Sequence, residues 1–181
     1  MKRFTVAGRN AIASRNLYAG LSLALMIPDI CASLEDPGPG KSHKRYVDWY
    51  NKWVKAKFTF PDQAGNPKVW ISAEDCFQLR CSLIHAGTAE IDPAKRNILD
   101  EFKFFESGEI PHLTWYQGNV VNGVLQPNWL QLRVDRFSEE LFKAADEWDL
   151  ATTEDADIQK AKDQLLIIHP KGTIIGGIKF G

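Results

Sequence analysis

The stretch Ser72-Ala-Glu-Asp-Cys-Phe-Gln-Leu-Arg-Cys-Ser-Leu-Ile-His-Ala-Gly87 decides the expected fold, because it carries the signals of one complete short helix. Ser72 and Asp75 have the spacing of a capping box in which Asp stands in place of the usual Glu. Gly87 is a typical helix stop. Apolar residues recur between these ends at helical spacing, at Cys76, Phe77, Leu79, Leu83 and Ile84. The sequence therefore predicts a largely buried helix over residues 72–86.

Two residues interrupt the apolar stripe of this helix, Arg80 and His85. An arginine cannot lose its charge, so a largely buried one needs a pocket, a partner or a subunit boundary. Five positions correspond to roughly 140° around a helix, a separation that suits flanking a groove rather than direct contact. We expect Glu74 or Asp75, which lie about one turn or more before Arg80, to supply the nearby negative charge that steers Arg80 or a second Arg across a dimer.

The segment Arg80-Cys-Ser-Leu-Ile-His85 resembles the Arg-x4-6-His motif of the HEPN superfamily, helical-bundle proteins of which many are RNA-cleaving toxins or defence nucleases. It falls on a short helix that follows two long predicted helices, which is where HEPN proteins carry the motif. Cys81 departs from the polar residue that commonly follows the Arg. The resemblance implies RNA cleavage by transesterification to a cyclic 2′,3′-phosphate, in a cleft that a homodimer shares, with no metal or other cofactor.

The residue types fit this chemistry. An imidazole such as that of His85 exchanges protons near neutral pH and could act on a ribose 2′-hydroxyl, while Arg80 could hold the scissile phosphate. A structural interpretation stays open beside the catalytic one. Arg80 would then bridge Asp75 or another acid of the bundle, and His85 would cap a backbone group.

Composition limits the classes of function. The chain has 181 residues, 44% of them apolar and 25% charged, with a net charge of −1, which suits one globular domain over residues 1–181. This charge excludes a strongly basic nucleic-acid coat, so any contact with RNA must be local. The three cysteines, Cys31, Cys76 and Cys81, have no metal-ligand spacing and favour reduced thiols in a cytoplasmic protein. His43, His112 and His169 lack an acid or thiol at ligand spacing, so we expect no metal site.

Further helices are predicted over residues 9–34, 41–58 and 135–151, after a ragged end at residues 1–8. Pro28 should kink the first of these helices or end its first half. The apolar run from Leu17 to Ile27 also admits a secretory signal as an alternative, but the long lead before it and Asp29 soon after it favour a core helix without a membrane span.

The predicted helix 41–58 is the one basic element, and it includes Lys41, Lys44 and Arg45. These three residues are candidates for binding the phosphates of an RNA substrate, with a solvated helix face as the simpler alternative.

Strand-like segments follow, at residues 102–105, 112–117 and 129–134, and we interpret residues 101–134 as a β-meander insertion that leans on the helices. The apolar tail from Leu165 to Phe180 should pair as strands or pack in a subunit interface.

These expectations combine into a mainly α-helical, HEPN-like bundle with a β insertion, acting as a dimeric, metal-independent endoribonuclease. In this interpretation Arg80 and His85 are catalytic, Glu74 and Asp75 support them, and a cognate antitoxin is a further expected partner. The alternative is a catalytically silent HEPN-fold interaction module or an antitoxin-like partner.

Overall fold

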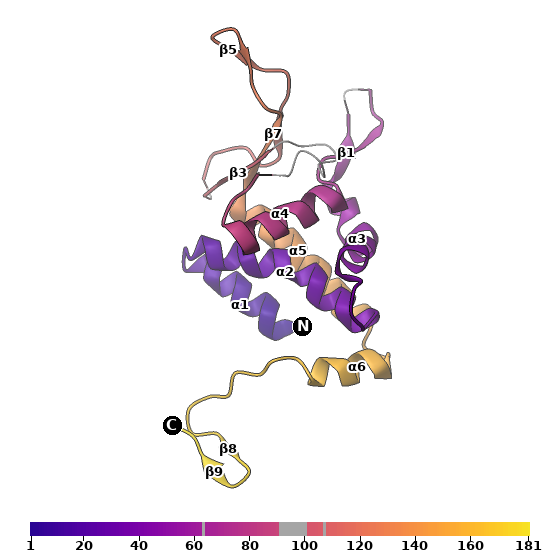
Figure 1. The fold of residues 1–181 in the computed structure, drawn as a ribbon, viewed down its shortest axis with the longest axis vertical. Helices are drawn as coiled ribbons and strands as arrows, with labels where there is room; N and C mark the ends of the chain where they lie inside the picture. The colour runs from indigo at the N-terminus through magenta and orange to yellow at the C-terminus, as the bar shows by residue number, and fades with distance from the viewer. Residues whose placement is uncertain (63, 91–100, 107) are drawn as a thin grey trace.

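The computed structural model describes residues 1–62, 64–90, 101–106 and 108–181, and the described chain is mainly α-helical (Figure 1). Its helices are α1 (Lys2–Ala13), α2 (Leu17–Glu35), α3 (Ser42–Trp53), α4 (Ala73–Ala86), α5 (Val134–Ala151) and α6 (Ala156–Asp163), with a short 3₁₀ helix η1 (Lys55–Phe58) after α3. Its strands are β1 (Thr59–Pro61), β2 (Pro67–Val69), β3 (Glu101–Phe105), β4 (Thr114–Tyr116), β5 (Val120–Val121), β6 (Val124–Leu125), β7 (Trp129–Arg133), β8 (Ile174–Ile175) and β9 (Ile178–Lys179).

The beginning of the chain differs from its prediction. Residues expected to be ragged form helix α1, and the single helix expected over residues 9–34 is two helices with a break at residues 14–16. Arg15 makes the turn there in the left-handed region, with a φ of 60°. Neither Gly nor Pro stands at the break, so the residue types that usually end a helix do not mark it. Pro28 does not end α2, which continues to Glu35.

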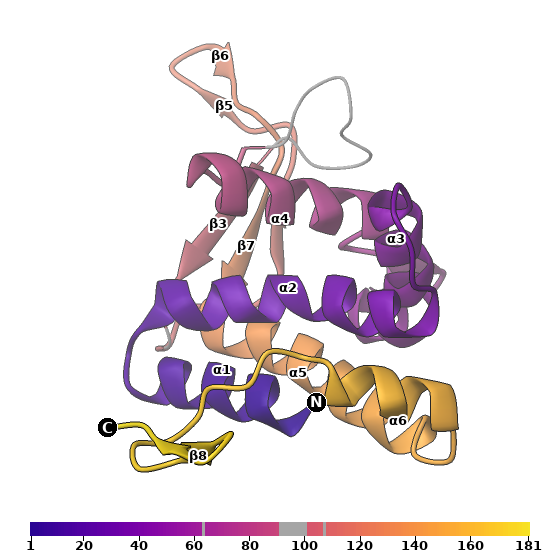
Figure 2. The same ribbon diagram turned by 60° about the horizontal axis from the view of Figure 1, so that its bottom comes forward.

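Helix α2 lies at the centre of the bundle, in contact with α1, α3, α4, α5 and α6. Figure 2 shows α4 on one side of α2 and α1 with α5 on the other. The buried residues of α2 include Ala24, Leu25, Ile27 and Cys31, each fully excluded from solvent. By length and composition α2 is the one helix in the described chain that could cross a membrane, a test that a core helix also passes.

Helix α1 packs closely on α5. A Cβ atom added to Gly8 would lie 2.2 Å from Cζ of Phe142, so the absence of a side chain at Gly8 allows this close approach. Polar contacts border the same interface, where Thr5 Oγ1 donates to Asp146 and Arg9 pairs with both Asp146 and Glu139. Charged and apolar contacts together therefore fix the two helices.

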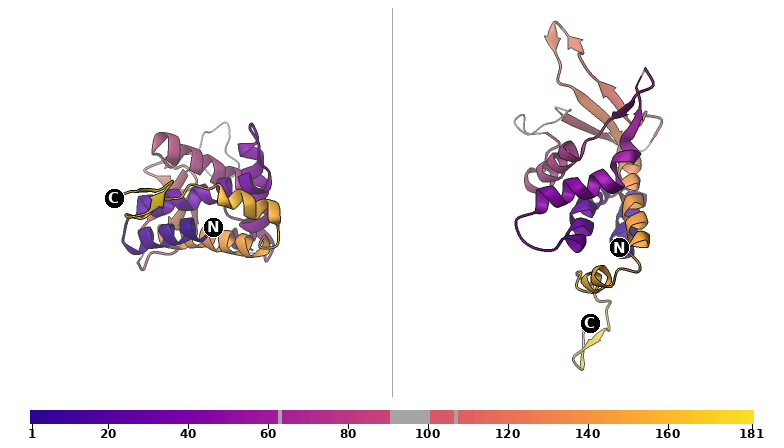
Figure 3. Two further views of the ribbon diagram at one scale, coloured as in Figure 1. Left: turned by 90° about the horizontal axis from the view of Figure 1, so that it is seen from below. Right: turned by 90° about the vertical axis from the view of Figure 1, so that its right-hand side faces the viewer.

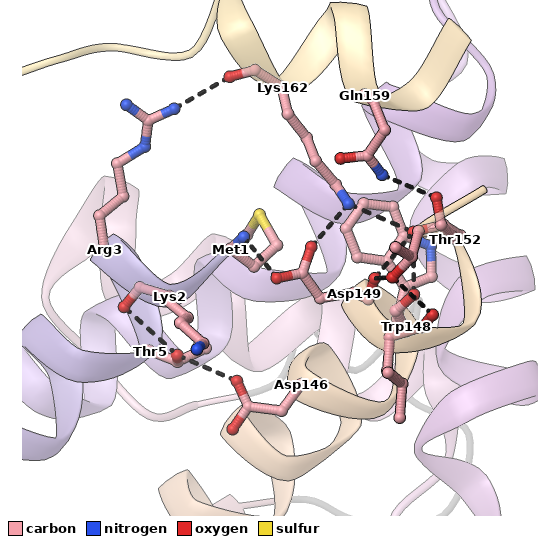
Figure 4. Close-up of polar contacts among 12 residues, drawn as sticks. Met1, Lys2, Arg3, Thr5, Asp146, Trp148, Asp149, Thr152, Gln159 and Lys162 are labelled. Atoms are coloured by element: carbon pink, nitrogen blue, oxygen red, sulfur yellow. Dashed lines mark hydrogen bonds and ion pairs between the residues drawn. The ribbon is translucent and has the colours of Figure 1, made fainter. Parts of the chain in front are cut away.

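Helix α6 is fastened to the ends of α1 and α5 by polar contacts (Figure 4). Lys162 lies 2.6 Å from Asp149, which also pairs with the Met1 amino group at 2.8 Å. Gln159 donates to the Thr152 carbonyl. Burial alone would raise the pKa of Asp149, but its bonds with Lys162 and the Met1 amino group lower it below the ordinary value.

The predicted strands exist, but their arrangement is not a meander. β7 is the central strand, parallel to β3 and antiparallel to β4. Leu130 and Leu132 of β7 are fully buried, which explains its central position, and the long connection from β3 permits parallel pairing. Phe104 packs on Phe137 of α5 at a ring distance of 5.4 Å, so the sheet leans on the helices as expected. β5 and β6 form a separate exposed hairpin.

The chain after α6 pairs as strands, as expected, in the small hairpin of β8 and β9. Figures 1 and 3 show this segment extending away from the helices, at the end opposite the β5–β6 hairpin. Its apolar side chains stay largely exposed, with Ile168 89% and Ile174 66% accessible.

Candidate functional site

Helix α4 carries the predicted motif and has the predicted ends. The Ser72 hydroxyl accepts a hydrogen bond from the backbone N–H of Asp75 at 3.0 Å and donates one to the Asp75 carboxylate at 2.7 Å. Gly87 ends the helix with a φ of 68°. Leu79 and Cys76 are buried against the bundle. The local signals of this helix were therefore sufficient to place it.

Arg80 forms an ion pair with Asp29 of α2, with 2.6 Å between Nε and Oδ2. The expectation that Glu74 or Asp75 supplies this counter-charge is wrong. Asp29 lies on α2, a different helix, and α4 contacts α2. The two side chains are 21% and 19% exposed. The two paired atoms are shielded from water and make no well-aligned hydrogen bond in the described chain, so each charge depends on the other.

The electrostatics of this pair are dominated by burial. Burial raises the pKa of Asp29, while Arg80 and a hydrogen bond from Ser42 at 3.3 Å act in the opposite direction without cancelling it. For Arg80, burial lowers the pKa and Asp29 raises it, with a net shift upward, so the guanidinium stays charged. Asp29 thus holds a permanent cation at the edge of the bundle.

His85 has a different environment from Arg80, although both are on α4. It lies in the last turn, is exposed, and makes no hydrogen bond or ion pair with any residue that the structure describes. Its neighbour Ile84 is 41% exposed. His85 is therefore free to meet a ligand or a second protein, and it does not cap a backbone group within the described ranges.

A cluster that the sequence did not suggest joins α3 to α4 beside Arg80. His43 Nε2 lies 2.6 Å from Glu74 Oε2, and its ring packs edge-on to Phe77 at 4.8 Å. The Arg80 guanidinium lies 6.0 Å from the same Phe77 ring. We call His43, Glu74, Phe77 and Arg80 the α3–α4 surface cluster. No sequence signal links His43 to Glu74, because they are 31 positions apart on different helices.

The candidate phosphate-binding residues lie at the start of α3. Lys41 pairs with Asp36 and Lys44 with Asp48. Arg45 donates to the carbonyl oxygens of Asp36 and Gly38. All three are partly or largely exposed. Their partners partly neutralise the positive charge, which would otherwise oppose the positive end of the α3 dipole.

The other predicted site residues have structural contacts. Asp75 is fully buried and bound to Ser72 at the start of α4. All three cysteines are free thiols; Cys31 and Cys76 are buried, and Cys81 is partly exposed with its Sγ 3.8 Å from Arg80 Nη1. Within the described ranges, no group of three or more His, Cys, Asp or Glu side chains could hold a metal ion.

Comparison with known proteins finds no matching family model, no matching curated protein and no matching solved structure.

Proposed function

We propose that this protein is a HEPN-type, metal-independent endoribonuclease in which Arg80 and His85 of two copies line one cleft. The observation that carries the proposal is the contrast along α4. His85 is exposed and without a partner in the described chain, while Arg80 is held in place by Asp29 and is still partly accessible. A fixed cation that can hold a phosphate and an imidazole that can exchange protons are the two groups that metal-independent cleavage of an RNA phosphodiester uses.

The reaction needs two proton transfers and one charge stabilisation. One imidazole removes the proton of the ribose 2′-hydroxyl, whose oxygen attacks phosphorus and displaces the 5′-oxygen. A second imidazole, from the other copy, returns a proton to that leaving oxygen. Arg80 offsets the negative charge that develops on the phosphoryl oxygens. The products are a 2′,3′-cyclic phosphate and a 5′-hydroxyl, so all atoms are conserved and water is not consumed.

The proposed dimer rests on the end of α4. The exposed Ile84 beside His85 offers an apolar contact there. A dimer interface at this end of α4 would bring the His85 residues of the two copies together. Light scattering at micromolar concentration should give a dimer, and Ile84→Asp should give a monomer. Leu150→Asp is the matched control, because Leu150 is an apolar residue of α5 that is 78% exposed. A monomeric wild-type protein would contradict the shared cleft.

The activity test compares RNA cleavage by the wild type, His85→Ala and His169→Ala in buffer with chelator. His169 is the control because it is an exposed histidine in the tail, outside α4. We expect loss of cleavage only in His85→Ala, products that end in 2′,3′-cyclic phosphate, and partial activity in Arg80→Lys, which lacks the planar fork. Equal cleavage by wild type and His85→Ala would refute the catalytic assignment.

A second candidate function is a catalytically silent interaction module of the same fold. The ion pair between Arg80 and Asp29 favours it, because this pair compensates the arginine charge inside one chain without any ligand. This candidate predicts no cleavage by the wild type and unchanged dimerisation in Arg80→Lys.

A further inference from the structure

A cavity away from α4's motif lies between the β1–β2 hairpin and strand β4. It measures about 480 Å³, and Asp62, Lys68, Trp70, Trp115 and Gln117 contribute to its lining. This volume is within the range of small-ligand sites, roughly 300–1,000 Å³. Figures 1 and 3 place the hairpin and the three-stranded sheet at the same end of the molecule.

Two indole rings form the aromatic part of this cavity. Trp70 and Trp115 meet edge to face, with 5.8 Å between their ring centres. Both indole nitrogens are shielded from water and have no hydrogen-bond partner in the described chain. Native proteins rarely leave such donors unpaired. Trp49 and Trp53 have the same unpaired donor, but Trp49 is fully buried in the core and neither residue contributes to the lining of this cavity, whereas Trp70 and Trp115 both do.

A cation stands over one of these rings. Lys68 Nζ lies 3.8 Å from the centre of the Trp115 ring, and no carboxylate of the described residues pairs with it. Many other basic side chains of the described chain do have a carboxylate partner, Lys57 and Lys162 among them. Lys68 is therefore available to an anionic group that enters the cavity.

The remaining polar groups supply hydrogen-bonding edges. Asp62 Oδ1 accepts from the backbone N–H groups of Ala64 and Asn66, which fixes the hairpin turn, and Oδ2 makes no hydrogen bond within the described ranges. Gln117 offers an amide that both donates and accepts. A ligand for this cavity thus has a flat ring, an N–H donor that can reach Asp62 Oδ2, and a negative group placed at Lys68, away from the Asp62 carboxylate.

We propose that the Trp70–Trp115 cavity binds one nucleotide of a single-stranded RNA, with its base against the indoles and its phosphate at Lys68. Aromatic stacking beside a basic group is how single strands are commonly held. A quaternary ammonium ligand fits less well, because Lys68 already places a cation over the Trp115 ring. The choice of RNA rests on the proposed ribonuclease function, whereas the chemistry of the cavity requires only a nucleotide. Trp70 of the cavity lies two residues before Ser72, where α4 begins, and His85 lies about 20 Å further along this helix by helical rise. The cavity and His85 would therefore engage different nucleotides of one strand.

The test measures fluorescence anisotropy of 5′-labelled eight-nucleotide oligoadenylate and oligouridylate on the full chain carrying His85→Ala, which prevents cleavage. Lys68→Ala and Trp115→Leu should each weaken binding tenfold or more, and Trp115→Phe should weaken it less because it keeps a ring. Lys52→Ala is the matched control: Lys52 lies 5.0 Å above the Trp53 ring on α3, outside the cavity lining, and its loss should change affinity less than twofold. Thermal melting checks that each variant is folded, and Lys68→Ala decides the question if Trp115→Leu is unfolded.

The two proposals fail separately. Unchanged affinity in Lys68→Ala overturns the nucleotide cavity, even if His85→Ala abolishes cleavage in the otherwise wild-type chain. Weakened binding in Lys68→Ala, together with no cleavage by the wild type, supports the cavity and refutes the ribonuclease. Lack of any oligonucleotide binding overturns the cavity proposal outright.

Discussion

Removal of Asp29 tests how the bundle tolerates the Arg80 charge. Asp29→Ala leaves a guanidinium that is 21% exposed without its partner. Breaking a fully buried pair from one side costs about 3–5 kcal/mol, and an exposed pair contributes about 0–1 kcal/mol. With both side chains about four-fifths buried, we expect a loss of about 2–3 kcal/mol, which lowers Tm by about 5–10 °C in a chain of this size.

The double variant Asp29→Leu with Arg80→Met carries the sharper expectation. The pKa of Asp29 is raised, so the folded protein binds this proton more tightly than the unfolded chain does. Ionisation of Asp29 is therefore less favourable in the folded protein than in the unfolded chain. The resulting loss of stability grows as pH rises from the ordinary pKa of an Asp carboxyl through the raised pKa of Asp29. Burial thus outweighs the attraction between Arg80 and the charge of Asp29. Protonated Asp29 still offers Arg80 an oxygen acceptor, which Ala lacks, so Asp29→Ala loses more than protonation does. Replacement of both residues should stay within about 1 kcal/mol of wild type.

Urea unfolding of the wild type, the single variants Asp29→Leu and Arg80→Met, and the double variant gives the coupling energy of the pair directly. The Asp29→Asn variant is the pH control, and its stability should not decline between the ordinary pKa of an Asp carboxyl and the raised pKa of Asp29. A double variant that loses the sum of the two single losses would refute the argument that desolvation dominates the pair. An Asp29→Ala variant within about 0.5 kcal/mol of wild type would show that water already screens Arg80.

Three further outcomes follow from positions elsewhere in the bundle. Leu79→Ala should lose about 2–5 kcal/mol of unfolding free energy in urea, because Leu79 is 1% exposed and its truncation leaves a cavity. His85→Ala should have the stability of the wild type, and equal stability of the two variants would contradict the placement of these residues. Gly8→Ala should lose about 1–3 kcal/mol because its new methyl group meets Phe142, and a gain in stability would mean that α1 shifts freely on α5. The pKa of Asp149 is lowered from the ordinary Asp value of 3.8, so its ion pairs stabilise the fold above pH 3.8, and this stability is lost as pH falls through the lowered pKa. Proteolysis within α6 should therefore increase over that acidic range, and Asp149→Asn should flatten the pH dependence.

Sequence signals that act within one helical turn were sufficient for α4. The Ser72 hydroxyl accepts from the Asp75 N–H and the Gly87 N–H donates to the Leu83 carbonyl, so both ends of the helix are fixed by residues only a few positions away and can be read without the rest of the fold. The partner of Arg80 could not be read in this way. Asp29 comes 51 positions earlier, and its proximity depends on how α2 crosses α4.

The β region shows the same distinction between local and distant signals. Alternation of apolar residues located β3 and β7, and Leu130 and Leu132 face the core as this pattern predicts. The burial of Gln131 on the other face of β7 left no such signal, because it follows from the central position of the strand. Pairing order is a property of the sheet, and a parallel neighbour from across a long connection leaves no mark on either strand. His43 was passed over for a comparable reason, since Glu74 becomes its neighbour only when α3 and α4 pack.

The burial of α2 by α5 has a consequence for synthesis of the chain. α2 ends at Glu35 and α5 begins at Val134, so at about 5–20 residues per second a ribosome needs roughly 5–20 s to deliver the second helix after the first. Throughout that interval the nascent chain presents its most apolar helix with only α1, α3 and α4 available to cover it. Factors that bind exposed apolar segments therefore have their main opportunity before Val134 emerges, and truncations that stop short of α5 should aggregate rather than fold.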